Sequence, residues 1–101
     1  MTKIRVAIAQ AEVAPDLAAG LDKTRVLTRQ AAGSGAKLVV FPETWLPGYP
    51  AWLDHCRDAA LWDHPPVKAV YSRMVANSVV VGGASGNALA GIAREASVAM
   101  V

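Results

Sequence analysis

Large apolar residues recur at every second position near the start of the chain, at Ile4, Val6 and Ile8. A spacing of two is typical of a β-strand. Ala7 and Ala9 stand between and after these positions, and alanine fits either face of a sheet. We therefore expect a strand that is mostly buried.

The next segment changes to steps of three and four residues. Its apolar stripe consists of Leu17, Leu21, Thr24, Leu27, Thr28 and Ala31. This spacing predicts a helix with one face turned toward the core. Asp16 is a favourable N-cap for that helix. Gly33-Ser34-Gly35 should end it, because glycine adopts the left-handed conformation at a helix C-terminus without steric penalty.

An unbroken apolar run, Leu38-Val39-Val40-Phe41, follows the helix. Such a run predicts a central strand that is covered on both faces. Pro42 should end the strand, because proline cannot donate a hydrogen bond to a sheet. A strand, a helix and a second strand within about forty residues favour parallel strands joined by a right-handed crossover.

Residues 42–66 contain five of the six prolines and all three tryptophans. A long proline-rich connection is usually functional or disordered, and the aromatic residues argue against disorder. We expect Trp45 and Trp62 to pack. Pro66 can begin a helix, and its apolar face would consist of Val67, Val70, Tyr71, Met74 and Val75.

Toward the C-terminus, Val79-Val80-Val81 has the propensity of a strand. Ser85 is a candidate cap for a following helix, whose apolar face would consist of Ala88, Leu89, Ile92, Ala93 and Ala96. The chain closes on Val98-Ala99-Met100-Val101, which has the pattern of the first half of a buried strand. Because chain ends normally lie exposed, this ending leads us to expect a fragment of a longer protein.

Composition narrows the class of protein. Apolar residues make up 53% of the 101 positions and charged residues 18%, which disfavours disorder and fits one globular domain. The formal charge is only +2 and the basic residues are scattered, which disfavours a nucleic-acid-binding protein. No apolar stretch reaches the length of a membrane span or a signal peptide. The single cysteine, Cys56, excludes an intrachain disulfide, and we expect a cytoplasmic protein.

Glu43 is the strongest candidate for chemistry. It follows the apolar run directly, and ligands of open α/β sheets bind at the carboxyl ends of the strands. The aromatic residues after it could exclude water. Desolvation raises the pKa of a carboxylate, which suits a general base. The alternative, a glutamate that caps a loop or faces solvent, stays open on the residues alone.

The segment Phe41-Pro42-Glu43, followed by Pro47-Gly48-Tyr49-Pro50 and Trp52, resembles the first signature of the nitrilase (carbon-nitrogen hydrolase) superfamily. The Tyr-Pro-x-Trp ending is more similar to the nitrilase branch than to the amidase or carbamoylase branches. Residues 6–10, 35–40 and 76–79 also resemble family segments, so the similarity covers essentially the whole chain.

The resemblance implies an α/β fold, the N-terminal part of an α-β-β-α sandwich. Residues 1–101 would supply two or three strands and the helices on one side. By this resemblance they would form a partial domain, truncated before the family's lysine and nucleophilic cysteine. The resemblance also implies a loop at residues 78–85, in place of the strand that propensity favours, and a third strand near Val98.

The resemblance assigns Glu43 to the general base that takes the proton of a cysteine thiol. The thiolate would attack a small-molecule nitrile or amide, and hydrolysis of the covalent thioimidate or thioester would release an acid and ammonia. Tyr49 and Trp52 are the candidate substrate-binding residues, and contact with a neighbouring subunit is the alternative. No metal or organic cofactor, no nucleic acid and no membrane is implied, and the complete protein is expected to form a homo-oligomer. The 101-residue chain alone should be inactive.

Other motifs are weaker. Cys56 lacks the Trp-Glu that follows the family's nucleophile. Asp54-His55-Cys56 with His64 matches no standard zinc spacing. Residues 82–86, Gly-Gly-Ala-Ser-Gly, lack the residues of a dinucleotide or phosphate loop and are better explained as a turn before a helix. A non-catalytic α/β binding or regulatory module, and a nucleotide-binding domain, remain as rival functions.

Overall fold

Three short strands form one parallel sheet in the order β1 (Val6–Ile8), β2 (Leu38–Val40) and β3 (Ala99–Met100). The computed structural model describes residues 2–61 and 63–101, so the packing predicted for Trp62 lies outside the described residues. Ala7 pairs with Val39, and Val39 pairs with Met100. Because all pairs are parallel, the carboxyl ends of the three strands meet at one edge of the sheet.

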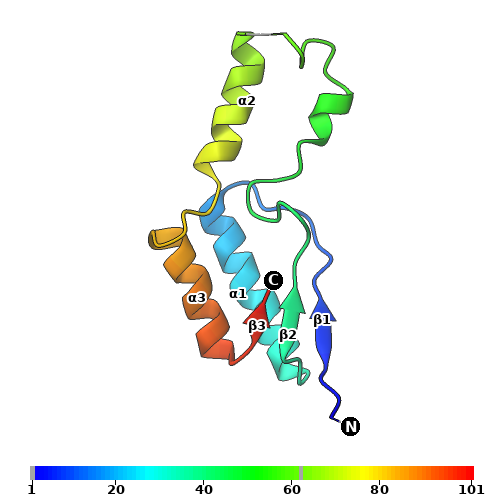
Figure 1. Ribbon diagram of the computed structural model, residues 1–101, viewed down its shortest axis with the longest axis vertical. Coiled ribbons are helices and arrows are strands. Elements are labelled where there is room, and N and C mark those ends of the chain that lie inside the picture. The colour runs from blue at the N-terminus through cyan, green and yellow to red at the C-terminus, as the bar shows by residue number, and fades with distance from the viewer. Residues whose placement is uncertain (1, 62) are drawn as a thin grey trace.

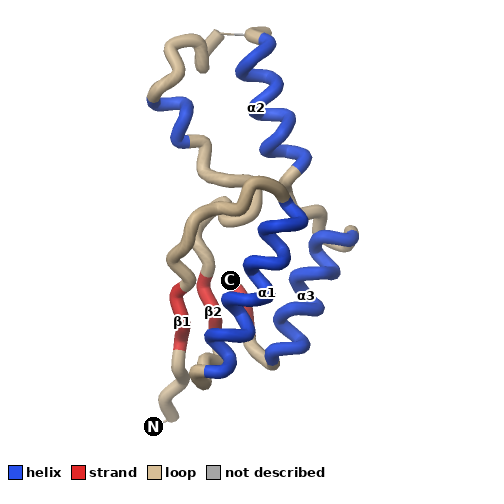
Figure 2. The backbone as a smooth tube through the Cα atoms, turned by 180° about the vertical axis from the view of Figure 1, so that it is seen from behind, coloured by secondary structure: helices blue, strands red, loops and turns tan. Residues whose placement is uncertain are grey.

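Helix α1 (Leu17–Gly33) connects β1 to β2. Its predicted ends are confirmed. The amide of Ala19 donates to the Asp16 carboxylate at 2.8 Å. At the other end Gly35 has φ +86°, and the amide of Ala36 reaches back to the Ala31 carbonyl at 3.1 Å. Seen from the helix side, β2 lies to the right of β1 (Figure 2), so the predicted right-handed crossover is confirmed.

Helices α1 and α3 (Ala84–Ala96) lie side by side on one face of the sheet (Figures 1 and 2). Val39 of β2 and Ile92 of α3 are almost fully buried between these layers. Side chains alternate along a strand, so the residues next to Val39 point to the other face of the sheet, which no helix within the described residues covers. The chain therefore forms one helix layer and one sheet layer, as the resemblance implied.

Two predictions about burial are wrong. The first strand was expected to be mostly buried, but Val6 and Ile8 are 46% and 79% exposed. The second was expected to be covered on both faces, but Leu38 and Val40 remain partly exposed. β2 is central in the sheet, as predicted, whereas β1 is an edge strand. Apolar patterning shows which residues can be buried, but it does not show whether a second layer is present to cover them.

The start of α3 also differs from the prediction. Gly83, and not Ser85, is the N-cap residue. Ser85 lies inside the first turn, where its hydroxyl accepts a hydrogen bond from the amide of Val80 at 2.9 Å. The segment before it is a loop, as the resemblance implied and against its strand propensity.

Residues 49–61 and 63–76 form an arm that projects from the sheet and its helices (Figure 1). It contains the short 3₁₀ helix η1 (Ala51–Asp54) and helix α2 (Pro65–Ala76), so the molecule is elongated, 53 × 27 × 21 Å. The helix predicted at Pro66 is thus confirmed, but none of its residues is buried. Two hydrogen bonds fasten the arm to the start of α1. Arg73 donates to the Pro15 carbonyl at 2.9 Å, and Asn77 accepts from the Leu17 amide at 3.1 Å.

Among the described residues, no helix combines the length and the apolar character needed to cross a bilayer.

Candidate active site

Glu43 lies at the carboxyl edge of the sheet, three residues after the end of the central strand β2. The chain leaves the sheet through Phe41, whose amide donates to the Val101 carbonyl at 2.7 Å, and then turns over residues 43–47. The predicted placement of this carboxylate, where ligands of parallel α/β sheets bind, is confirmed.

The predicted surroundings of Glu43 are wrong for the described part of the chain. Its side chain is exposed, and within residues 2–61 and 63–101 its carboxylate makes no hydrogen bond or ion pair. The aromatic residues that follow do not enclose it. Trp45 turns into the core and is 7% exposed, whereas Tyr49 is 67% exposed. The ring nearest in sequence is therefore used for packing and does not shield the carboxylate.

Trp45 fastens the turn to α1, so its predicted packing role is confirmed. Its indole N–H donates to the hydroxyl of Thr24 at 2.8 Å, and that hydroxyl donates to the Gly20 carbonyl at 2.7 Å. The rings of Phe41 and Trp45 lie 5.4 Å apart between centroids. The sequence placed Thr24 on the core stripe but did not indicate this bond. The available signal was a hydroxyl within an apolar stripe, because a buried hydroxyl usually has a partner.

An apolar cavity of about 230 Å³ lies beside the turn. Phe41, Pro42 and Trp45 contribute from the turn, and Leu89 and Val101 contribute from the opposite side. Glu43 is not part of this lining, although residues on both sides of it are. The turn at the edge of the sheet therefore carries both the carboxylate of Glu43 and residues that line an apolar cavity, but Glu43 does not line that cavity.

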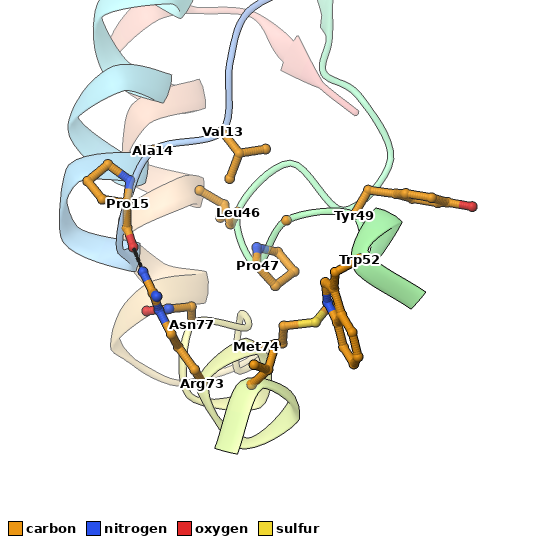
Figure 3. A pocket seen from close by; sticks show the side chains of 12 residues that line it. Val13, Ala14, Pro15, Leu46, Pro47, Tyr49, Trp52, Arg73, Met74 and Asn77 are labelled. Atoms are coloured by element: carbon orange, nitrogen blue, oxygen red, sulfur yellow. Dashed lines mark hydrogen bonds between the residues drawn. The ribbon is translucent and has the colours of Figure 1, made fainter. Parts of the chain in front are cut away.

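Tyr49 and Trp52 line a second cavity, of about 220 Å³, between the body of the molecule and the arm (Figure 3). Pro47 forms the wall on the side of the body, which is the sheet with α1, α3 and the turn, and Met74 of α2 forms the wall on the side of the arm. The ring of Tyr49 points away from the cavity, and the ring of Trp52 lies beside Met74. The structure thus brings the two predicted substrate-binding residues to one cavity, whose lining does not include Glu43.

Two polar residues of this cavity, Arg73 and Asn77, were not singled out from the sequence. Their partners are backbone groups about sixty residues away along the chain, at Pro15 and Leu17. Such contacts leave no local pattern, so only the folded arrangement reveals them.

The alternative motifs find no support as sites in the described residues. His64 faces Asp58, with His64 Nε2 3.8 Å from Asp58 Oδ2, and no group of three or more potential metal ligands comes together there. Cys56 lines an apolar hollow of the arm with Trp52. In the glycine-rich turn, a Cβ on Gly86 would lie 2.7 Å from the Val80 carbonyl oxygen, so close packing requires this glycine.

Comparison with known proteins gives a consistent result. The carbon-nitrogen hydrolase family profile matches residues 5–101. An arylacetonitrilase of Aspergillus oryzae is 46% identical over 81 residues, which are 79% of this chain and 22% of that protein. An arylacetonitrilase of Fusarium vanettenii is 41% identical over 98 residues, 96% of this chain and 26% of that protein.

The match is therefore nearly complete for this chain and partial for its relatives. The chain spans about a quarter or less of the length of these two curated relatives. No solved structure matches it. The matched segment contains the sheet, the helices and the turn that carries Glu43, and on this basis the chain belongs to the carbon-nitrogen hydrolase family.

Proposed function

We propose that this chain is the N-terminal part of a nitrilase that converts a nitrile to a carboxylic acid and ammonia, with Glu43 as the general base. The observation that carries the proposal is the position of Glu43 at the carboxyl end of the central strand, in a family of carbon-nitrogen hydrolases. The name of the similar proteins, arylacetonitrilase, suggests a nitrile whose carbon chain bears an aromatic ring.

In the proposed reaction a cysteine outside these 101 residues is the nucleophile. Glu43 takes the thiol proton, because a free thiol with a pKa of about 8.5 is mostly protonated at neutral pH. The sulfur adds to the nitrile carbon, and the proton that Glu43 took from the thiol passes to the nitrile nitrogen, which gives a thioimidate. Water then adds and ammonia leaves, which gives a thioester. A second water releases the acid and restores the thiol.

Cys56 is not proposed as this nucleophile. It lies in the arm, in an apolar hollow formed with Trp52, Pro66, Val67 and Val70. Glu43 lies on the turn at the edge of the sheet and is absent from this lining. The proposal therefore predicts that the 101-residue chain alone releases no ammonia from a nitrile.

Tyr49 and Trp52 are proposed to contact the aromatic part of the substrate. Both line the cavity between body and arm, whose other walls are largely apolar. The ring of Trp52 lies beside Met74, whereas the ring of Tyr49 points outward and would have to turn inward to meet a ligand. A homo-oligomer of the complete protein, and a reaction that needs no cofactor, are part of the same proposal.

The test uses a hybrid enzyme in which the 98 matching residues of this chain replace their counterpart in the Fusarium vanettenii arylacetonitrilase. With phenylacetonitrile as substrate, the hybrid should release ammonia and phenylacetic acid. Glu43→Gln should lower kcat by about 10²–10⁴-fold, the contribution expected of a general base. Glu12→Gln is the matched control, because Glu12 is also exposed.

A folded hybrid that keeps its kcat with Glu43→Gln would contradict the role of this carboxylate. A hybrid that has the circular dichroism of its parent but no activity would favour the rival, a non-catalytic module. If the large hybrid does not fold, a smaller one that carries only residues 36–53 tests the same substitution.

A further inference from the structure

We propose that Thr44 is a positioning residue, which fixes the backbone from which the Glu43 side chain extends, through a strained backbone conformation. This inference rests on the proposed role of Glu43 as general base. It concerns what fixes the backbone of a residue whose side chain is exposed and has no side-chain partner among the described residues.

Thr44 has φ +54°, in the left-handed region. Among the described residues, only two others that are not glycine share a positive φ, Asp63 and Ser97. Thr44 is the one with a branched Cβ, and a branched side chain makes this conformation a steric outlier. Such conformations persist only where the surroundings determine them, and they are concentrated at functional sites.

Two hydrogen bonds close around the strained residue. The Thr44 hydroxyl donates to the carbonyl of Glu43 at 2.6 Å, and the amide of Gly48 donates to the carbonyl of Thr44 at 2.8 Å. The first bond holds the carbonyl of the Glu43–Thr44 peptide in place, and the second closes the turn. The hydroxyl of Thr44 therefore acts on the backbone of the residue whose side chain is proposed to react.

The chain on both sides of Glu43 is anchored to the rest of the molecule. Phe41 is bonded to the third strand, Trp45 is bonded to Thr24 of α1, and Leu46 is 6% exposed. Leu46 packs so closely on α1 that a Cβ on Gly20 would lie 2.9 Å from its Cδ2 atom. These anchors hold the chain in place on both sides of Glu43 and Thr44.

The backbone then fixes the direction in which the Glu43 side chain leaves the turn, which is the direction of its Cα–Cβ bond. Rotation at Thr44 would turn the peptide that joins it to Glu43 and move the carboxylate relative to the sheet edge. A displacement of about 1 Å is enough to lower a rate by about a hundredfold when proton transfer depends on alignment. Thr44 is therefore proposed to support proton transfer through the backbone of Glu43 and not through contact with the substrate.

The kinetic test compares three substitutions in the hybrid enzyme. Thr44→Ser keeps the hydroxyl and eases the strain, so kcat should stay within about twofold. Thr44→Val keeps the shape and removes the hydroxyl, so kcat should fall by about a hundredfold while KM stays unchanged. Thr44→Gly tolerates φ +54° but frees the turn, so kcat should fall by about tenfold. Thr28→Val is the matched control, since Thr28 lies on α1 away from the turn.

The outcomes separate this inference from the proposed function. Full kcat in Thr44→Val, together with a large loss in Glu43→Gln, overturns the positioning role and leaves the general base intact. A loss in Thr44→Val that Thr44→Ser shares also overturns it, because the hydroxyl would then not be the cause.

A second measurement uses the 101-residue chain itself and needs no activity. A positive φ brings the amide and α protons of a residue close together, so Thr44 should give a strong intraresidue nuclear Overhauser effect between them. The Thr44→Ser chain should keep this signal at the substituted position, and the Thr44→Val chain should lose it there. A weak signal for Thr44 in the folded chain would overturn the inference whatever the hybrid does.

Discussion

Two buried threonines of α1 show that burial alone does not determine how much a hydroxyl contributes to stability. Thr24 and Thr28 are both fully buried and lie one helical turn apart. The hydroxyl of Thr24 bonds both Trp45 and the Gly20 carbonyl, whereas that of Thr28 has no hydrogen-bond partner among the described residues. A buried polar group without a partner costs free energy, so the two residues should differ sharply in their response to the same substitution.

Thr24→Val should lower the free energy of unfolding by about 1–3 kcal/mol, because it leaves the indole N–H of Trp45 buried without an acceptor. Thr28→Val should leave the stability unchanged or raise it, because it replaces an unsatisfied hydroxyl with a methyl group. Urea denaturation of both variants, followed by circular dichroism, measures the difference. Equal losses in the two variants would contradict the account of Trp45 as an anchor.

At Glu43 the sequence predicted the place of the residue but not its surroundings. The apolar run of β2 and the proline after it define where the strand ends, and both signals are local. The enclosure of the carboxylate depends on which way the later aromatic rings turn. Trp45 turns inward because Thr24, about twenty residues earlier, offers its hydroxyl. No local pattern contains that information.

Among the elements, α1 was predicted most completely. Its first and last turns are determined by groups within a few residues, the carboxylate of Asp16 and the left-handed Gly35. The strands were found correctly, but their burial was not, because burial depends on what lies across the sheet. Ser85 was predicted to be the cap of α3. Its hydroxyl instead accepts a hydrogen bond from an amide of the preceding loop and not from the helix amides, so the prediction is wrong.

The close approach of α1 and the turn gives a prediction at Gly20. An added Cβ there would meet Leu46 at 2.9 Å, whereas nothing lies within 4 Å of a Cβ added at Gly91 of α3. Gly91→Ala should raise the free energy of unfolding by about 0.5–1 kcal/mol through helix propensity. Gly20→Ala should lose this gain or lower the stability. Thermal melting of both variants measures the difference in stability. An equal rise in melting temperature would contradict the close packing of Leu46 against Gly20.

For the whole molecule, the uncovered face of the sheet is the feature that most affects behaviour in solution. Ile8 is 79% exposed and Val6 46% exposed, on a strand at the edge of the sheet. Exposed apolar edge strands favour association between chains. The sequence pattern had already suggested incomplete burial at the end of the chain, and the structure adds β1 to the surface concerned.

Ile8→Lys should therefore lower self-association of the 101-residue chain, because a charge resists desolvation at a sheet surface. Val81→Lys is the control, since Val81 is 94% exposed but lies in the loop before α3. Sedimentation velocity at several concentrations measures the monomer fraction. An unchanged fraction in Ile8→Lys, or an equal rise in both variants, would show that this face of the sheet does not drive association.

The arm gives the cavity of Tyr49 and Trp52 two walls that are attached in different ways. Pro47 belongs to a turn that the sheet and α1 hold on both sides, whereas Met74 belongs to a helix without a buried residue. Arg73 and Asn77 fasten the end of that helix to the start of α1. Substitutions at Met74 can therefore change the size of the opening without disturbing the turn that carries Glu43, so that the range of ligand sizes and the chemistry can be altered separately.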